Sequence, residues 1–390
     1  MRIRVLVATL AIALIGTTGC MEEPSPVGAR LLPKDDIVTV KTDTIGALGN
    51  SYARKFPAFR DPTRILFGNA GSIDTEAWAW IKFSPPDAIE GTLIEASINL
   101  KGAYALGNTS QELSYILHKG LKNWFIDTTN VDSLSLDAIQ PGSYYESVGR
   151  PGFLPVQHDT TDFSIPLDTS LVREWLNAIT DPTKSNFGVV LKPTNTNLIR
   201  GFRSFRDIDP ANAPQLVIVY QHASGARDTA RISRGEDRFL ARVTSAIWIN
   251  DSLTVRIRNG ISYRGVLDFK NVVLAKNYAV HRALLEVTLE DSTALNDYTT
   301  HTLYAYFMTE SGVVENLLSP SEVGTSNGQK VYRFIVSNFV HFWGRGMPVR
   351  TIAIGGATEQ NTIDVFALHG PGSSNIAARP KLIITYTEFR

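Results

Sequence analysis

The sequence predicts an all-β protein of two tandem, jelly-roll-like antiparallel β-sandwich domains, each with one short helix. The first observation is an internal repeat, because a close variant of residues 163–220 returns at residues 332–386. The second is a series of short apolar runs that alternate with period two and are separated by turn residues, as strands require. The third is the length of 390 residues, which exceeds one ordinary domain.

Each copy is expected to contain one short helix with an apolar face. In the first copy this face consists of Leu171, Val172, Trp175 and Leu176, and Asp168 is the expected N-cap. In the second copy it consists of Phe339, Val340 and Trp343, with Ser337 or Asn338 as the N-cap. The periodicity predicts that both tryptophans are core residues.

Each copy is expected to close on a strand that starts with proline, whose missing N–H is tolerated there. These strands are Pro-Gln-Leu-Val-Ile-Val-Tyr at 214–220 and Pro-Lys-Leu-Ile-Ile-Thr-Tyr at 380–386. Further strands are expected at 37–40, 65–68, 78–83, 93–100, 113–118, 189–191 and 202–205 in the first copy, and at 239–249, 253–257, 263–269, 283–289, 304–308, 352–354 and 365–368 in the second. The Asn259-Gly260 pair predicts a hairpin turn.

The N-terminus resembles a bacterial lipoprotein signal. A charged start is followed by an apolar run at 5–15, too short to span a bilayer as a helix, and by small residues up to Cys20. Cys20 is the expected lipidation site and the only cysteine, so no intramolecular disulfide can form. Thr17 departs from the usual leucine of the motif, and Met21 is typical of outer-membrane sorting. The alternative is an ordinary secretory signal.

These features divide the chain into five predicted segments. They are a signal peptide at 1–19, a lipidated tether at 20–36, a first β-sandwich at 37–220, a linker at 221–235 and a second β-sandwich at 236–390. Lys plus Arg equals Asp plus Glu at 38 each, so no bulk charge attracts nucleic acid, which we exclude as a partner.

Aromatic residues are the candidate ligand-binding groups. Trp78 and Trp80 share one face of a predicted strand, where they could stack on sugar rings if that face is exposed. The alternative is that they are core residues, given the area an indole buries. Trp124, Tyr144 and Tyr145 lie in predicted loops, where binding residues are often found.

No motif of metalloprotease, serine hydrolase, P-loop or dinucleotide-binding chemistry occurs in the chain. Weak calcium candidates are two acidic pairs, Asp159 with Asp162 and Asp207 with Asp209. Otherwise no cofactor is expected. A polysaccharide-cleaving enzyme would need paired carboxylates or a Tyr/His pair brought together by the fold, and the two copies share no such charged set.

The order of the elements resembles the DNRLRE, or disaggregatase-related, repeat family. The resemblance rests on strands that end in Lys-Phe83 or Asp-Phe269, on the Leu/Phe-Val-x-x-Trp helices and on the closing Pro-x-Leu-x-Ile-x-Tyr strands. It covers both copies. It implies an extracellular β-sandwich related to carbohydrate-binding modules. The family's tryptophan loop has only Trp124 as a counterpart.

The first hypothesis is therefore a non-catalytic, lipid-anchored surface or envelope protein that binds glycan or another cell-surface polymer. The second is a structural or assembly component of the envelope that binds protein partners through strand edges or loops. A polysaccharide-cleaving enzyme ranks third. The membrane, reached through the lipid, is an expected partner in all three, with the protein facing the periplasm or the exterior.

Overall fold

The structure is a computed structural model. It describes residues 39–49, 52–55, 62–85, 89–124, 136–156, 162–194, 197–244, 252–261, 263–290 and 302–388. The expected signal peptide, Cys20, the tether and Asp159 lie outside this part. Neither of the two helices that the described residues form is long and apolar enough to cross a membrane.

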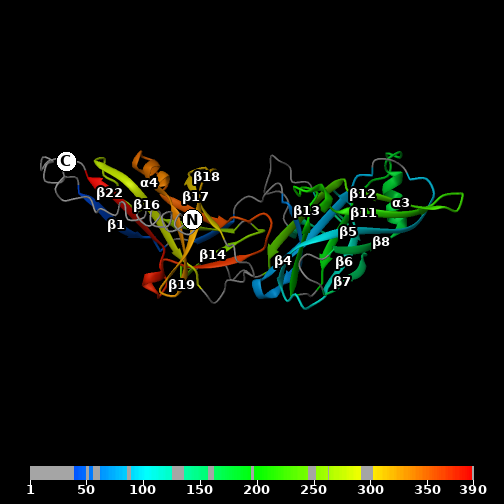
Figure 1. The fold of residues 1–390 in the computed structure, drawn as a ribbon, viewed down its shortest axis with the longest axis horizontal. Helices are drawn as coiled ribbons and strands as arrows, with labels where there is room; N and C mark the ends of the chain where they lie inside the picture. Colours follow the sequence, from blue (N-terminus) through cyan, green and yellow to red (C-terminus); the bar gives the residue numbers. More distant parts are fainter. Residues whose placement is uncertain are drawn as a thin grey trace, which may run out of the picture.

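The predicted all-β fold is confirmed: two curled antiparallel sheets form two bodies that lie end to end (Figure 1). The N-terminal body contains β3 (Arg64–Ala70), β4 (Thr75–Phe83), β5 (Thr92–Gly107), β6 (Leu113–Lys119), β7 (Arg150–Leu154), β8 (Asp162–Leu167), β9 (Val189–Pro193), β10 (Leu198–Arg203), β11 (Gln215–Gln221), β12 (Arg227–Ile232) and β13 (Gly235–Val243). The C-terminal body contains β1 (Val40–Gly46), β2 (Tyr52–Lys55), β14 (Thr254–Arg258), β15 (Tyr263–Asp268), β16 (Tyr278–Thr288), β17 (Leu303–Thr309), β18 (Gly312–Ser326), β19 (Gln329–Ile335), β20 (Thr351–Gly356), β21 (Val365–His369) and β22 (Lys381–Glu388).

The internal duplication is visible in the strand pairing. The closing strand β11 pairs with β5, and β22 pairs with β16 in the same antiparallel sense. Both ladders shift register at the same place, directly before the closing Tyr220 or Tyr386. Such a bulge bends the longer strand. The two bodies are therefore copies of one strand arrangement.

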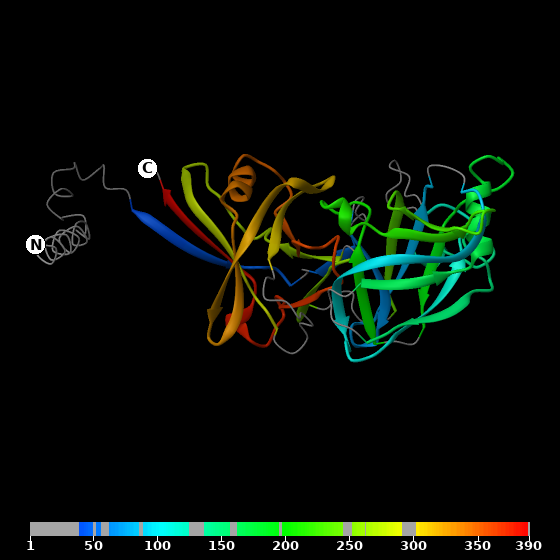
Figure 2. The same ribbon diagram turned by 45° about the vertical axis from the view of Figure 1, so that its right-hand side comes forward.

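The structure corrects the predicted domain boundaries at two places. β1 and β2 precede the N-terminal body in sequence but pair with β22 and β15 of the C-terminal body. The expected linker contains β12, which pairs with β11, and β13 pairs with β4. Figure 2 shows β1 (blue) beside β22 (red) at the end of the molecule that lies away from the N-terminal body. A period-two pattern predicts a strand but not the sheet that it joins.

Each body has one short helix, as predicted. In α3 (Thr169–Asn177), Asp168 is the N-cap, and its carboxylate accepts the N–H of Ser170. In α4 (Ser337–Gly344), the predicted cap is wrong, because Ser337 is already helical and Val336 precedes it. The Ser337 hydroxyl instead accepts the N–H of Ala283 on β16, which leaves no N-cap side chain.

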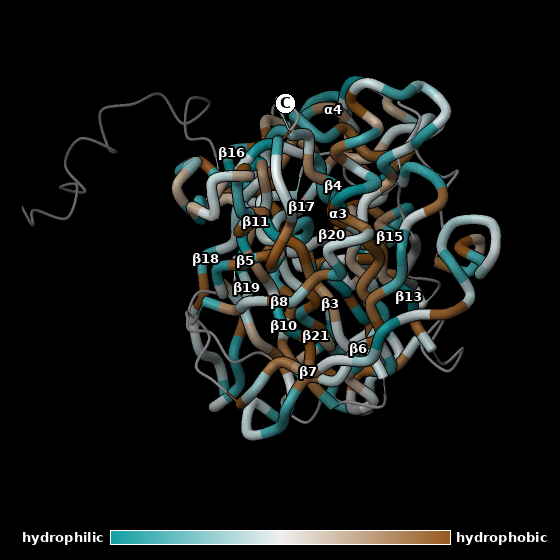
Figure 3. Tube along the Cα trace, turned by 90° about the vertical axis from the view of Figure 1, so that its right-hand side faces the viewer, coloured by the Kyte–Doolittle hydropathy of each residue, from teal (hydrophilic) through white to brown (hydrophobic). Residues whose placement is uncertain are grey.

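Each body packs around its own hydrophobic core. Trp175 of α3 and Trp343 of α4 are buried in these cores, as predicted. Viewed along the long axis, hydrophobic stretches gather toward the middle of the molecule and hydrophilic stretches toward the rim (Figure 3). Burial of apolar area is therefore the main stabilising term, since no disulfide is available.

A buried polar contact joins the two bodies. The Tyr104 hydroxyl donates to Asp364 at 3.1 Å and accepts the N–H of Ile363 at 3.2 Å. Arg258 donates to the carbonyl oxygen of Ile73 at 2.7 Å. Ile363 also packs in the hydrophobic core of the N-terminal body. The two sandwiches therefore share a packed, hydrogen-bonded junction.

Candidate functional site

A polar depression lies on the outer face of the N-terminal body, where β5 runs between β8 and β11. On β5, Ile98 and Leu100 point into the core, so the alternating positions Asn99 and Lys101 face outward. Asn99 lies opposite Ser164 on β8 and opposite Gln215 on β11. The strand order thus gathers three polar side chains in one row.

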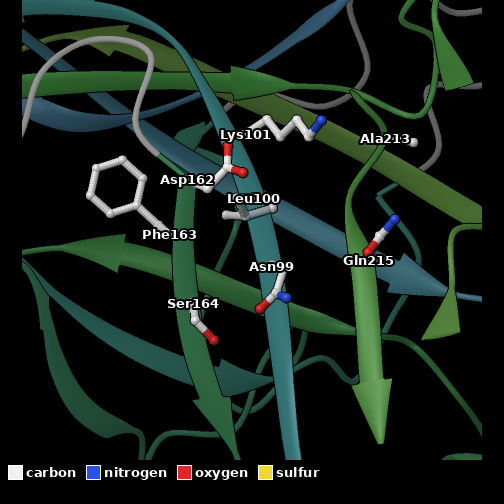
Figure 4. A pocket seen from close by; sticks show the side chains of 8 residues that line it. All are labelled: Asn99, Leu100, Lys101, Asp162, Phe163, Ser164, Ala213 and Gln215. Carbon is white, nitrogen blue, oxygen red and sulfur yellow. The ribbon is translucent and has the colours of Figure 1, made fainter. Parts of the chain in front are cut away.

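The depression has a volume of about 190 Å³. Figure 4 shows Asn99 and Lys101 on the central strand, flanked by Ser164 and Asp162 on β8 and by Gln215 on β11. Lys101 donates to the side-chain carbonyl oxygen of Asn212 at 3.3 Å, which holds the amine at the rim. The lining therefore offers amide, hydroxyl, carboxylate and ammonium groups within one hollow.

Asn99 has a side-chain oxygen that no described residue pairs with. Its side-chain oxygen is buried and has no hydrogen-bond partner among the described residues. A buried polar atom without a partner is unfavourable by roughly 1–3 kcal/mol, which a ligand hydroxyl or amine can relieve. The Asn99 amide therefore has hydrogen-bonding capacity that the surrounding described residues do not use.

The five aromatic candidates come together, but not as an exposed platform. Trp78, Trp80, Trp124 and Tyr145 are 4%, 2%, 0% and 3% exposed, and all four belong to a second hydrophobic cluster on the outer face of β4. Tyr144 packs against this cluster and is half-buried. The prediction of a stacking surface is therefore wrong for Trp78 and Trp80, and the core alternative applies to them. Of the three loop candidates, Trp124 and Tyr145 are buried with them and Tyr144 is partly exposed.

Hydrogen bonds fix two of the indoles. The Trp78 N–H donates to Glu76 at 2.8 Å, and the Trp80 N–H donates to the carbonyl oxygen of Phe187 at 2.6 Å. The Tyr145 ring lies edge-on to Trp78, with centroids 5.8 Å apart. Aromatic rings whose N–H groups are hydrogen-bonded and that pack edge-on against each other are typical of a core.

Lysines lie over the outermost rings of the same cluster. The Lys192 amine is 4.8 Å from the centroid of the Trp78 ring, and the Lys122 amine is 5.0 Å from that of Tyr144. These cation–π contacts occupy ring faces that a sugar would need. Of the five aromatics, Tyr144 keeps the most exposed surface.

The described members of the acidic pairs, Asp162, Asp207 and Asp209, do not gather into a metal centre. Asp207 accepts from Arg203 at 2.9 Å and from the N–H of Asp209, and Asp209 in turn caps a short 3₁₀ turn through the N–H of Ala211. Asp162 lines the polar depression. Within the described ranges, no group of three or more His, Cys, Asp and Glu side chains could hold a metal ion.

The sequence interpretation missed most of the depression. The sequence patterns do not point to Asn99, Lys101, Ser164 or Gln215, whereas Asp162 is one of the weak calcium candidates. The available signal was the polar alternation along 97–101 and 162–164. That alternation also describes any solvated strand face, so it did not identify a site.

A charge cluster in the C-terminal body was also missed. Arg264 on β15 is buried, donates to Glu359 at 3.0 Å and to Glu315 at 2.9 Å, and lies 4.1 Å from the Tyr306 ring. Two carboxylates and an aromatic face surround the guanidinium, so its positive charge is balanced inside the fold. This cluster is structural rather than a binding surface.

No family model matches the chain, and no curated protein matches it either. The resemblance to the DNRLRE repeat family therefore stays a prediction.

Solved structures that were matched include the capsid protein VP2 of infectious bursal disease virus. Its subviral particle is 8% identical, with 90% of this chain and 77% of that chain covered and a TM-score of 0.14. T=1 particles derived from this virus are 10% identical, with 90% and 74% covered and a TM-score of 0.12. The Gx strain is 10% identical, with 92% and 80% covered and a TM-score of 0.13. At these TM-scores the likeness carries no argument about this chain.

Proposed function

We propose that this chain is a non-catalytic, lipid-anchored protein of the bacterial envelope that binds glycan in the polar depression of its N-terminal body. The observation that carries the proposal is the polar row of Asn99, Ser164 and Gln215, in which the Asn99 side-chain oxygen has no hydrogen-bond partner among the described residues. Sugar hydroxyls both donate and accept hydrogen bonds, so they match a lining of amide, hydroxyl and charged groups.

The size of the depression supports a small contact on a polymer. At about 190 Å³ it is smaller than a pocket for a drug-sized ligand, and it suits a single sugar ring or branch. Without an exposed aromatic face, the binding would rest on hydrogen bonds. We therefore expect weak affinity per site that repeated sugar units reinforce.

The position of β1 supports an orientation relative to the membrane. If Cys20 carries the lipid, the tether joins the molecule at β1, which lies at the end of the C-terminal body away from the depression. The N-terminal body would then be the part farthest from the membrane. In that orientation a polymer outside the bilayer could reach the proposed site, and the proposal locates the protein at the outer membrane.

The test uses the chain from residue 20 onward with Cys20→Ser, applied to a panel of bacterial, algal and plant polysaccharides in affinity electrophoresis. We expect retardation by at least one polymer, and a loss of about tenfold or more in affinity for Asn99→Ala combined with Lys101→Ala. Ser97→Ala, on the same face of β5 but outside the depression, is the matched control and should bind normally.

The alternative function is an assembly component of the envelope. It is favoured by one observation, namely that a strand pair far away in sequence completes the C-terminal body. Absence of binding across the whole panel would overturn the glycan proposal and leave this alternative, which pull-downs from envelope extracts would then test.

A further inference from the structure

The consecutive strands β1 and β2, which pair with β22 and β15, hold in the C-terminal body the place that β12 and β13 hold in the N-terminal body. Each set of two consecutive strands is called a strand pair, although its members pair with other strands. In the first ladder, Ile45 lies opposite Leu382, and in the second, Ile232 lies opposite Leu216. These two leucines are equivalent residues of the closing strands, each two positions after the proline. β1 and β12 are therefore added to the same edge in the same register.

The second strands of the two pairs also correspond. β13 adds to β4, with Phe239 opposite Ala79, and β2 adds to β15, with Ala53 opposite Gly265. β4 and β15 are the equivalent strands of the sequence repeat, since β4 ends at Phe83 and β15 ends directly before the equivalent Phe269. Both bodies are thus completed by a β-pair of the same kind.

The two pairs differ in how they are connected to the body that they complete. β12 follows β11 through a tight turn, in which the N–H of His222 donates to the carbonyl oxygen of Ala226. β1 reaches β22 from far away in sequence, since the paired Thr42 and Thr385 are 343 positions apart. In the C-terminal body, therefore, no short loop requires that the completing pair come from the same molecule.

Few side-chain contacts hold β1 in place. Its side chains are exposed except for Ile45, which is partly buried against the core. Lys41 forms an ion pair with Glu388, and the Tyr386 hydroxyl lies 3.0 Å from the Asp43 carboxylate. Most of the binding is the backbone ladder with β22, which any copy of the same strand can form.

We infer that β1–β2 is an exchangeable strand pair, through which a second copy of this chain can complete the C-terminal body. Within one molecule the tethered pair has a high effective concentration, so the self-completed monomer dominates at low protein concentration. When β1–β2 of one molecule completes the C-terminal body of another, two molecules can exchange these strands reciprocally and form a swapped dimer. Alternatively, each molecule donates its strands to the next, which gives a chain of copies.

The test traps the ladder with cysteines at facing positions. The starting protein is the chain from residue 20 with Cys20→Ser, which has no other cysteine. Thr42→Cys and Thr385→Cys are made as separate variants, because these two side chains face each other across β1 and β22. The two variants are mixed, unfolded, refolded together at high concentration, oxidised and run on a non-reducing gel.

The matched control uses the equivalent pair of the N-terminal body, Val219→Cys and Thr229→Cys, which face each other across β11 and β12. The tight turn between these strands opposes exchange there. We expect a covalent dimer from the first mixture and, in the second, no more than the unmixed single variants give. Peptide mapping should show residues 42 and 385 joined.

The double variant, Thr42→Cys with Thr385→Cys in one chain, should form its disulfide within a monomer at low concentration. If it does so while the mixture of single variants yields only monomers, β1–β2 does not exchange and the inference is overturned. Equal dimer formation in both mixtures, or a double variant that does not oxidise, would overturn it as well.

Discussion

Ile45 and Ile232 hold the same position in the two bodies of this protein, each opposite the leucine that is the second residue of a closing strand. One comes from the first described strand of the chain and the other from the segment between the two copies. The N-terminal strands therefore complete the C-terminal body rather than the body that follows them in sequence.

Removal of residues 20–55 should loosen the C-terminal body selectively. β22 would lose its edge partner, so the amides of Lys381–Glu388 should lose at least about tenfold in protection from hydrogen exchange. The equivalent strand Gln215–Gln221 keeps β12 and should be unchanged. Hydrogen-exchange mass spectrometry measures both in one sample. Loss of protection in Gln215–Gln221 instead would mean that β1 belongs to the N-terminal body.

Trp80→Ala should destabilise the protein strongly. The side chain is almost fully buried and its N–H is paired with the carbonyl oxygen of Phe187, so truncation removes about 3–5 kcal/mol from the free energy of unfolding. Tyr144→Ala, at the edge of the same cluster, should remove about 1 kcal/mol or less. Urea unfolding measures the difference. Similar small losses for both would indicate that the cluster is an open surface.

Glu359→Gln should cost far more stability than Glu315→Gln. Both carboxylates accept from Arg264, but Glu359 is buried with it, whereas the side chain of Glu315 is 58% exposed. Removing the buried charge leaves the guanidinium poorly compensated, with a loss of about 3–5 kcal/mol, compared with about 0–1 kcal/mol for the exposed partner. The variants are compared by urea unfolding at pH 8, and equal losses would contradict the buried pairing.

Asp237 should make the protein less stable as the pH rises from about 4 to about 7. Burial raises the pKa of this carboxyl to about 6, although Ser204 and the N–H of Phe205 donate to it. The folded protein thus binds the proton more tightly than the unfolded chain does. The resulting stability is complete below pH about 4 and is lost as the pH passes about 6.

The measurement for Asp237 is the difference in unfolding free energy between the unsubstituted chain and Asp237→Asn, taken at several pH values. This difference removes the contributions of other carboxylates. As the pH rises across this window, the unsubstituted chain should lose roughly 2–3 kcal/mol of unfolding free energy relative to Asp237→Asn. A constant difference would contradict the raised pKa, because it would show that Asp237 has the same pKa in the folded and unfolded protein.

The fold was predictable because its signals are local. Period-two runs gave the strands, and the face of Val172 and Trp175 gave the first helix. The Ser337 cap failed because Ala283, remote in sequence, provides a donor for that hydroxyl. Likewise, no local pattern states that β1 pairs with β22. Sheet membership and competing tertiary contacts are non-local properties.

The site was less predictable for the same reason. The alternation along β4 correctly separates Trp78 and Trp80 from the main core, but it cannot show that residues such as Leu136 and Ile139 cover this second face. The depression depends on the adjacency of β5, β8 and β11, which brings Asn99 beside Gln215 only in the folded sheet. The sequence therefore points to aromatic residues as binding candidates, because their type alone suggests contact with sugars.

The most direct test of the proposed function is an NMR titration of the labelled chain from residue 20, Cys20→Ser, with the polysaccharide fragment that binds best in the panel. We predict that the side-chain amide signals of Asn99 and Gln215 shift on binding, while the indole N–H signals of Trp78 and Trp80 stay in place. Shifted indole signals with an unchanged Asn99 amide would contradict the account and move the site to the aromatic cluster.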